Sequence, residues 1–385
     1  MSATSPVPEE ERLARAALSL AGEPGHPRIT DEVSAKGGRR TYDDLLAGRS
    51  VLSEDLAARM QRLDPAAELA RAAARGVRFV VPGDEEWPGA LDDLAFAPAV
   101  QERGGVPVGL WVRGAGRLEE LAREAVAVVG SRSASAYGGQ LAADIAATVA
   151  ASGYTVVSGA AFGIDFQAHR GALTVDGPTV AVLACGVDRA YPAKHAPLLE
   201  HVAQRGVVVS EAPLGGAAMR VRFLARNRLI AGLCRGTVVV EAAYRSGALN
   251  TANWTDGLGR TLMGVPGPVS SATSAGVHQL IRSRGALLVT SGAEVLEAIG
   301  PIGSFLLRPM RGAERARDLL DSLEQQVLDA VPVVRAAPTQ SVARTAGVEP
   351  QRTRQALGRL ADAGLVECVD GGWRVRPGQE ETEPG

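Results

Sequence analysis

The sequence predicts an α/β protein built on a mainly parallel sheet. Between residues 77 and 290, short runs rich in β-branched residues alternate with amphipathic stretches. Strands and helices that alternate at this length form a parallel sheet with helices on both faces. Helical patterns come before this region, and helices followed by a hairpin come after it. The expected architecture is an extended Rossmann-like sheet with a smaller domain on each side.

The predicted strands share a short apolar run, usually with turn residues after it. These runs are VRFVV, VGLWV, AVAVV, YTVVS, TVAVLAC, VVVSE, TVVVE, TLMGV and ALLVT. N-terminal to them, ERLARAALSLAG and SEDLAARMQRLDPAAELARAAARG have apolar residues at helical spacing, and a polar, Gly-rich turn is expected between them.

C-terminal to the sheet region, a charged segment leads into two short helices, a longer helix and a hairpin that turns at Asp370-Gly371-Gly372. That order is typical of a winged helix-turn-helix. The last residues are acidic, and we expect them to be disordered. The predicted boundaries are 1–74 for a helical, SAM-like domain, 75–305 for the Rossmann-like domain, 306–318 for a linker, 319–377 for the winged helix and 378–385 for the tail.

Composition and charge narrow the class of protein. The chain has 385 residues, of which 46% are hydrophobic and 22% charged, and no apolar run is long enough for a membrane span. Its start is acidic where a signal peptide would be basic and apolar, so we expect a cytoplasmic location. The formal net charge is −2, so any affinity for nucleic acid requires a local concentration of basic groups.

Metals and cofactors are not expected. Cys185, Cys234 and Cys368 are far apart and odd in number, so we interpret them as reduced and buried, without a disulfide or a zinc site. The first βα turn lacks the G-x-G-x-x-G pattern. The next strand ends in Ser158-Gly159, where an NAD site would have an acidic residue.

The first candidate site is the turn Gly130-Ser131-Arg132, which follows a buried strand and precedes a helix. Parallel sheets place ligands at such turns, where backbone N–H groups and the helix dipole favour an anion. Arg132 adds a planar fork that suits a phosphate. The turn after the next strand holds Gly159 and Gly163, which permit a tight turn.

Asp165 and His169 follow this second turn at positions i and i+4 of one helix face. They are an acid/base pair by type, but we prefer a contact that locks the loop. Later turns present Lys194 near Tyr191 and Pro192, and a second anion-binding turn at Ser246-Gly247. Glu241 ends the strand before that turn, and we expect it to hold Arg or Asn side chains of neighbouring turns.

The richest segment is RVRFLARNRLIAG, in which four arginines surround an aromatic ring and an asparagine. These residues are Arg220, Arg222, Arg226, Arg228, Phe223 and Asn227. Arginines that contact phosphates, beside an aromatic on which a base stacks, are what single-strand binding requires. Because Leu224, Leu229 and Ile230 take the core positions of this helix, we expect Phe223 to stack on a base. One or two of the arginines are expected to be structural.

In chain order, VVGSR, VVSGAAFGID with AHRGAL, VLACGVDRAYP, VSE, RFLARNRLIAGL, VVVEAAYRSGALNTA, GVPGPV and HQLIRSRGALLV closely resemble the DNA-processing protein A family, DprA or Smf. The resemblance covers residues 77–300. It implies a protein that binds and protects single-stranded DNA, forms a homodimer and loads RecA recombinase onto incoming strands in natural transformation. It implies no catalysis.

Carried over by position, the resemblance assigns strand contacts to Gly130, Ser131, Arg132, Arg220, Phe223, Arg226, Asn227 and Arg228. Phe162 departs from the family pattern, because an arginine is usual there and one cation is lost. Leu224-Ala225 replaces a pair that contains proline, and Asn250 and His278 replace commoner residues.

Two other functions stay open. Related Rossmann-like domains with a glutamate near a Gly-rich phosphate turn cleave or sense nucleotides, and Glu241, Asp165 and His169 would then carry the chemistry. Alternatively the winged helix binds duplex DNA as a regulator, with Arg352, Arg354 and Arg359 on its recognition helix.

Overall fold

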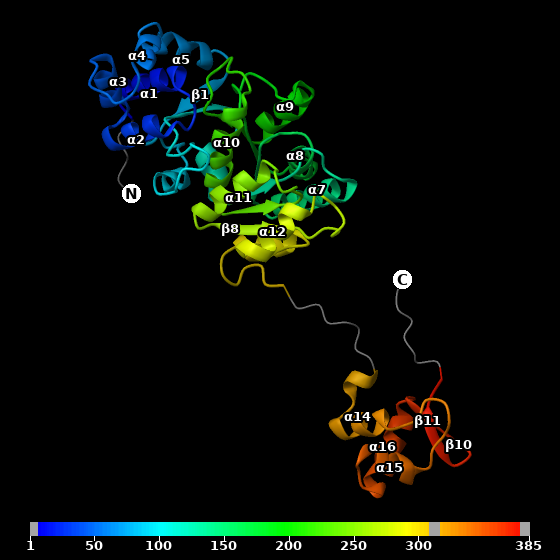
Figure 1. Cartoon of the computed structure of the whole chain (residues 1–385). Coiled ribbons are helices and arrows are strands. Elements are labelled where there is room, and N and C mark those ends of the chain that lie inside the picture. The colour runs from blue at the N-terminus through cyan, green and yellow to red at the C-terminus, as the bar shows by residue number, and fades with distance from the viewer. Residues whose placement is uncertain (1–6, 308–315, 378–385) are drawn as a thin grey trace. The chain divides into compact units, whose positions relative to one another are not determined.

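The computed structural model describes residues 7–307 and 316–377. Contacts divide the chain into two compact units, Met1–Leu307 and Arg308–Gly385 (Figure 1). Each unit has its own hydrophobic core. Most of the predicted linker, 308–315, and the whole predicted tail, 378–385, lie outside the described residues.

A mainly parallel sheet forms the centre of the first unit, as the sequence predicts. Within residues 7–307 it has nine strands in the order β1-β2-β6-β5-β4-β3-β7-β8-β9. In this order, the strands β6, β5, β4, β3, β7, β8 and β9 are all parallel to their neighbours in that set. β2 pairs antiparallel with both β1 and β6. Their bounds are Val77–Val80 (β1), Leu110–Arg113 (β2), Ala125–Val129 (β3), Thr155–Ser158 (β4), Thr179–Val182 (β5), Val207–Ser210 (β6), Gly236–Val239 (β7), Thr261–Gly264 (β8) and Leu287–Leu288 (β9).

Helices cover both faces of this sheet. One face carries α7, α8, α9 and α13, and the other carries α6, α10, α11 and α12 with the 3-10 helix η1. Both apolar layers are fully buried, with Ile145 and Ala168 on the first face and Leu91, Leu229 and Trp254 on the second. The bounds are Gly89–Ala95 (η1), Leu118–Arg123 (α6), Ala136–Ala151 (α7), Ile164–Thr174 (α8), Ala193–His195 (η2), Ala196–Arg205 (α9), Arg220–Gly232 (α10), Ala248–Gly257 (α11), Ala275–Arg284 (α12) and Gly292–Ile299 (α13).

The order in which the parallel strands are added to the sheet reverses at β3. β3 leads to its neighbour β4 on one side, while β7 lies on its other side and continues to β8 and β9. In open sheets of this type, a crevice forms outside the carboxyl ends of the strands at such a switch point, and ligands bind there. The turns after β3, β4 and β7 meet at this edge.

The N-terminal helices lie at the β1 end of the sheet (Figure 1). Their bounds are Glu9–Ala21 (α1), Pro27–Lys36 (α2), Gly38–Leu46 (α3), Glu54–Met60 (α4) and Pro65–Ala73 (α5). α2 and α3 occupy the segment that we expected to be a turn, and that expectation is wrong. They bury only Ile29, Val33 and Leu45 among large apolar residues, so their pattern is weak in the sequence.

These five helices have a small core of their own around Leu18 and Met60. In addition, Ala16 of α1 and Ala72 of α5 pack with Phe79 of β1 and Trp111 of β2. The Trp111 indole donates a hydrogen bond to Ser19 Oγ at 3.1 Å. The helices and the sheet therefore belong to one compact unit by contact, and the predicted boundary at residue 74 stays a prediction.

The second unit has three helices followed by a hairpin, the order that the sequence predicts for a winged helix. Asp370 and Gly371 make the hairpin turn with φ of 50° and 78°, as a tight two-residue turn requires. Cys368 is exposed on the hairpin, so the expectation that it is buried is wrong, whereas Cys185 and Cys234 are buried. The bounds are Ala316–Leu319 (η3), Ser322–Asp329 (α14), Thr339–Ala346 (α15), Pro350–Asp362 (α16), Val366–Val369 (β10) and Gly372–Val375 (β11).

No helix within residues 7–307 and 316–377 is long and apolar enough to cross a membrane. The same residues contain no group of three or more His, Cys, Asp or Glu side chains placed to hold a metal ion.

Candidate nucleic-acid interface

Backbone hydrogen bonds join the turns after β3, β4 and β7 into one surface. The Ser131 N–H donates to the Glu241 carbonyl at 2.7 Å, and the Ile164 N–H donates to the Ser131 carbonyl at 3.1 Å. A Cβ at Gly163, whose φ is 78°, would collide with the Ser131 and Arg132 carbonyls. The close approach therefore requires glycine there, which gives Gly163 a structural reason.

The Glu241 carboxylate orders the turn after β3. It accepts hydrogen bonds from Ser135 N–H at 2.9 Å, Ser135 Oγ at 2.5 Å and Thr273 Oγ1 at 3.2 Å, and the residue is only 3% exposed. Ser135 in turn caps α7 by accepting from the Gly138 N–H. Glu241 thus holds a backbone turn and two hydroxyls. The expectation that it holds Arg or Asn side chains named the wrong partners.

Arg226 is a buried anchor for α10. Its Nη1 donates to the Gly159 carbonyl at 2.8 Å and to the Val182 carbonyl at 2.7 Å, at the carboxyl ends of β4 and β5. Only 6% of the residue is exposed. A Cβ at Gly159 would overlap the guanidinium, so glycine is required at that position. Two sheet carbonyls and the Asn227 side chain engage three of its donors, so Arg226 has a structural role in this structure, and its predicted contact with DNA stays a prediction.

Asn227 and Arg228 are also buried. Asn227 Nδ2 donates to Asn250 Oδ1 at 3.1 Å, and its Oδ1 accepts from Arg226 Nε at 3.1 Å. Arg228 is fully buried and forms a two-pronged ion pair with Glu211 at 2.5 and 2.7 Å. Arg228 does not reach the surface and is corrected to a structural role, whereas Asn227 keeps 7% exposure and its predicted strand contact stays a prediction.

Phe223 lies on α10 between the arginines nearer its start, Arg220 and Arg222, and the buried Arg226 and Arg228. Its ring is half-buried and belongs to no hydrophobic core cluster within the described residues. The Arg132 guanidinium lies 4.8 Å and that of Arg226 5.8 Å from the ring centroid. Tyr191, which is 49% exposed, contacts the same ring at 5.5 Å between centroids. Aromatic and cationic groups therefore meet at the predicted position.

Several exposed cations on this edge have no carboxylate partner in the ranges that the structure describes, and three of them are predicted contact residues. Arg132, Lys194 and Arg220 are exposed, and none of them forms an ion pair there. Arg222, by contrast, pairs with Glu23 at 2.7 and 2.9 Å. The free cations are thus those that an anionic ligand can reach without breaking an ion pair.

Asp165 and His169 do not form the predicted contact with each other. Burial raises the pKa of the Asp165 carboxyl, while Arg226 and the backbone N–H groups of Gly130, Gly159 and Ala161 oppose this rise. Burial lowers the pKa of His169 to about 3. His169 Nδ1 lies 2.7 Å from Thr179 Oγ1, whose own proton goes to the Val156 carbonyl. His169 therefore links α8 to β5. Its partner is Thr179, and not Asp165 as we expected.

The remaining predicted residues divide between surface and core. Ser158 is fully buried and donates to the Val128 carbonyl at 2.7 Å, so its side chain cannot contact a ligand and that prediction is corrected. Gly130 and Ser131 are half-buried in the first turn. Ser246 Oγ accepts from the Ala248 N–H at 3.3 Å, and Gly247 is exposed at the start of α11.

From the sequence we assign no ligand contact to Tyr191 or Phe162, two aromatic residues that lie at this edge of the sheet. Tyr191 was not included among the contacts, although it follows β5 in a turn at the same sheet edge. Phe162 was noted only as the loss of a cation. Both rings are large exposed apolar groups at the carboxyl edge of the sheet, and that placement is the signal that could have identified them.

Together the fold and the edge define a class. This is an extended Rossmann-like α/β protein whose switch-point turns present exposed aromatic rings and unpaired basic groups. Residues 78–300 match the model of the DNA recombination-mediator protein A family. The chain belongs to this family, as its resemblance to DprA and Smf predicted.

Similar proteins cover most of the chain. A DprA relative from Mycobacterium tuberculosis is 44% identical over 368 residues, which are 94% of this chain and 94% of the relative. Protein Smf from Escherichia coli is 35% identical over 305 residues, or 76% of each chain. The X-ray structure of DprA from Streptococcus pneumoniae is 28% identical, has a TM-score of 0.62 and covers 76% of this chain and 99% of its own. These matches confirm the α/β fold class and place the protein among DNA-processing proteins.

We predict that Gly159→Ala destabilises the protein by about 1–3 kcal/mol, because the methyl group would displace the Arg226 guanidinium from two carbonyls. The matched control is Gly247→Ala, where a Cβ meets nothing within 4 Å and the backbone is already helical. Urea unfolding of both variants measures the difference. Equal stability of the two variants would contradict the anchoring role of Arg226.

Proposed function

We propose that this protein binds single-stranded DNA at the carboxyl edge of its sheet and acts in the cytoplasm as a recombination mediator without catalysis. The observation that carries the proposal is the contact between Arg132 and Phe223. An exposed guanidinium without an acidic partner in the described residues lies 4.8 Å from an aromatic ring outside the core. Backbone phosphates and bases need this pair of chemistries, and neither depends on base sequence.

In this proposal the bound strand breaks the contact between Arg132 and Phe223. A base on the ring and a phosphate at Arg132 replace it. A base stacks on Phe223 or Tyr191 in place of Arg132, whose cation–π contact at an exposed site contributes only about 0.5–1 kcal/mol. The released Arg132 fork then takes the neighbouring phosphate. Lys194 and Arg220 supply further positive charge along the edge.

The mediator role rests on membership of the family. Its description names a recombination mediator, and the curated relative from Streptococcus pneumoniae bears the name of a DNA processing protein. We therefore propose that the bound strand is protected and handed to RecA recombinase during natural transformation or recombination. A RecA loading assay on coated single-stranded DNA tests this step.

A nucleotide-cleaving enzyme is less well supported by the side chains. Glu241 is buried and its oxygens accept three hydrogen bonds from Ser135 and Thr273. Asp165 is enclosed beside Arg226 and backbone donors. Release of free base from a panel of nucleoside monophosphates would favour the enzyme instead.

A duplex-binding role of the second unit has one observation in its favour. Arg352 and Arg354 are exposed on α16 and form no ion pair in the described residues, whereas Arg359 pairs with Glu324 at 2.6 Å. Affinities for single-stranded and duplex oligonucleotides distinguish this role from the proposed one. Tighter binding to duplex would favour a regulator that acts through the winged helix.

Arg132→Ala should weaken single-strand binding regardless of base sequence and lower the salt dependence by about one phosphate unit. Arg226→Ala, in contrast, should act through folding because Arg226 is buried. Arg123→Ala is the control, since Arg123 precedes β3 and lies at the opposite edge of the sheet. Titrations at several salt concentrations decide, and an unchanged slope for Arg132→Ala would refute the site.

Phe223→Ala should cost about 1–3 kcal/mol of DNA affinity and leave the melting temperature nearly unchanged. The reason is that the half-buried ring packs against Arg132 and Tyr191 at the edge of the fold. Phe79→Ala is the comparison, because Phe79 is 6% exposed and should cost about 3–5 kcal/mol of folding stability. A large melting loss with unchanged affinity for Phe223→Ala would overturn the stacking role.

We also propose a homodimer through the β9 end of the sheet. Residues 274–300 contain α12, β9 and α13, and β9 is an edge strand whose Leu287 and Leu288 are 50% and 54% exposed. Such an edge favours self-complementary pairing. Light scattering should find a dimer at micromolar concentration and a monomer for Leu288→Lys. A monomeric unaltered protein would contradict the proposal.

A further inference from the structure

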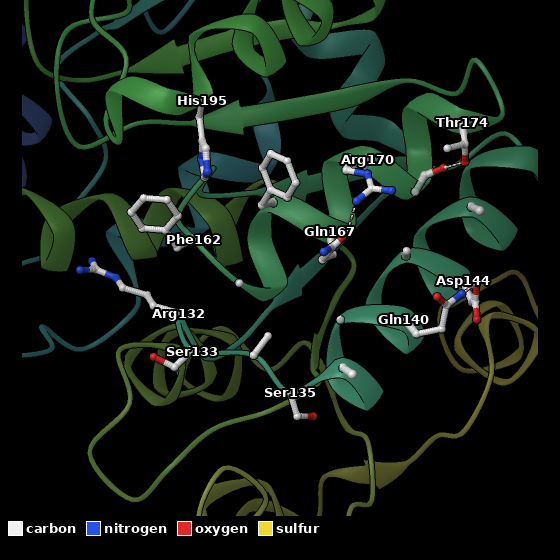
Figure 2. A pocket seen from close by; sticks show the side chains of 18 residues that line it. Arg132, Ser133, Ser135, Gln140, Asp144, Phe162, Gln167, Arg170, Thr174 and His195 are labelled. Atoms are coloured by element: carbon white, nitrogen blue, oxygen red, sulfur yellow. Dashed lines mark hydrogen bonds between the residues drawn. The ribbon is translucent and has the colours of Figure 1, made fainter.

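A cleft runs from the turn after β3 along the junction of α7 and α8 (Figure 2). Its volume is about 930 Å³. Arg132, Ser133 and Phe162 line the end nearest the sheet edge, and Asp144, Arg170 and Thr174 line the far part. From Ala136 to Ala147, which both line it, α7 rises by about 16 Å at 1.5 Å per residue. The cleft therefore extends well beyond Arg132.

An aromatic cluster forms one wall of this cleft. Phe162 is 46% exposed and meets His195 edge to face with 4.9 Å between ring centroids. Phe166 lies 4.7 Å from the same imidazole. His195 is buried and fixed by its Nδ1, which lies 2.9 Å from the Ala160 carbonyl. The Phe162 ring is thus supported from behind, while nearly half of its surface stays open to solvent.

Core packing does not explain Phe162. The ring belongs to none of the hydrophobic clusters in the described residues, and the cleft that it lines also contains polar side chains such as Arg132 and Gln167. Figure 2 shows it between His195 and Arg132. A large exposed ring in a polar cleft is a typical stacking surface for a planar ligand.

Backbone contacts between the turns after β3 and β4 fix the position of Phe162 relative to Arg132. Gly163, the next residue, packs directly on the Ser131 and Arg132 carbonyls, and the Ile164 N–H donates to Ser131 at 3.1 Å. The stacking surface and the phosphate fork are therefore held on one rigid double turn. A ligand that occupies both must carry an anion and a flat ring at neighbouring positions, which describes a nucleotide unit.

We propose that Phe162 is a stacking platform for a further base of the strand whose phosphate lies at Arg132, so that the strand continues into the cleft between α7 and α8. This inference rests on the proposed function. Arg170 extends the positive charge into the cleft, since its guanidinium contacts Gln167 and Phe166 and no carboxylate in the described residues. Asp144 is the carboxylate in the lining, and Gln140 donates to it at 2.8 Å.

The test compares Phe162→Ala, Phe162→Trp and Phe162→Arg in the full chain, with a short oligothymidylate and with the same strand made abasic. Phe162→Ala should weaken oligothymidylate binding roughly 5- to 150-fold with an unchanged salt slope, because a stack is lost and no charge changes. Phe162→Trp should bind as the unaltered protein does. Phe162→Arg should increase the salt slope by about 0.7, the value for one phosphate of a single strand. On the abasic strand, Phe162→Ala and the unaltered protein should bind equally.

Arg132→Ala separates failure of this inference from failure of the proposed function. If Phe162→Ala binds oligothymidylate normally while Arg132→Ala does not, the platform is wrong and the DNA site stands. If both variants bind normally, the proposed site itself fails. Loss of free thymidine monophosphate binding without loss of strand binding would instead make the cleft a nucleotide pocket and overturn the platform. Melting temperatures confirm that each variant is folded.

Discussion

The carboxyl edge of the sheet, where we propose that DNA binds, depends on one buried cation. Arg226 reaches from α10 to the carbonyls of Gly159 and Val182, so a helix that connects β6 to β7 is fixed across the ends of β4 and β5. Phe223 lies one helical turn earlier on the same face, because residues three apart on a helix are neighbours. Burying a guanidinium is costly unless its donors are paired. The two carbonyls, the Asn227 side chain and the nearby Asp165 meet that need.

The sheet was predictable from the sequence, and the division of the arginines was not. Nine apolar runs between turn residues specify strands locally, and the structure has a strand in each. Arg226 and Arg228 look like Arg220 in the sequence, but their acceptors are Gly159, Val182 and Glu211, which lie 17 to 67 residues away along the chain. Only the topology brings those acceptors beneath α10. The exposure of Arg132, the place of Phe223 outside the core and the supporting role of Glu241 were predictable from the sequence, whereas the residues that they contact were not.

Local electrostatics explain how a chain with a net charge of −2 can present a site for an anion. Many of its arginines are neutralised by carboxylates, such as Arg222 by Glu23 and Arg228 by Glu211. Arg132, Lys194 and Arg220 lack such partners within the described residues and lie in the segments that follow β3, β5 and β6, at the carboxyl edge of the sheet. Selective pairing thus leaves positive charge at the edge where the fold also presents aromatic rings.

The central claim is that a single DNA strand contacts the aromatic residues at the carboxyl edge of the sheet. Photocrosslinking with an oligonucleotide that carries iododeoxyuridine, followed by peptide mapping, tests it most directly. We expect crosslinks to peptides that contain Tyr191 and Phe223, and we expect these crosslinks to be lost when unmodified oligothymidylate competes. Crosslinks confined to residues 339–377 of the second unit would contradict it.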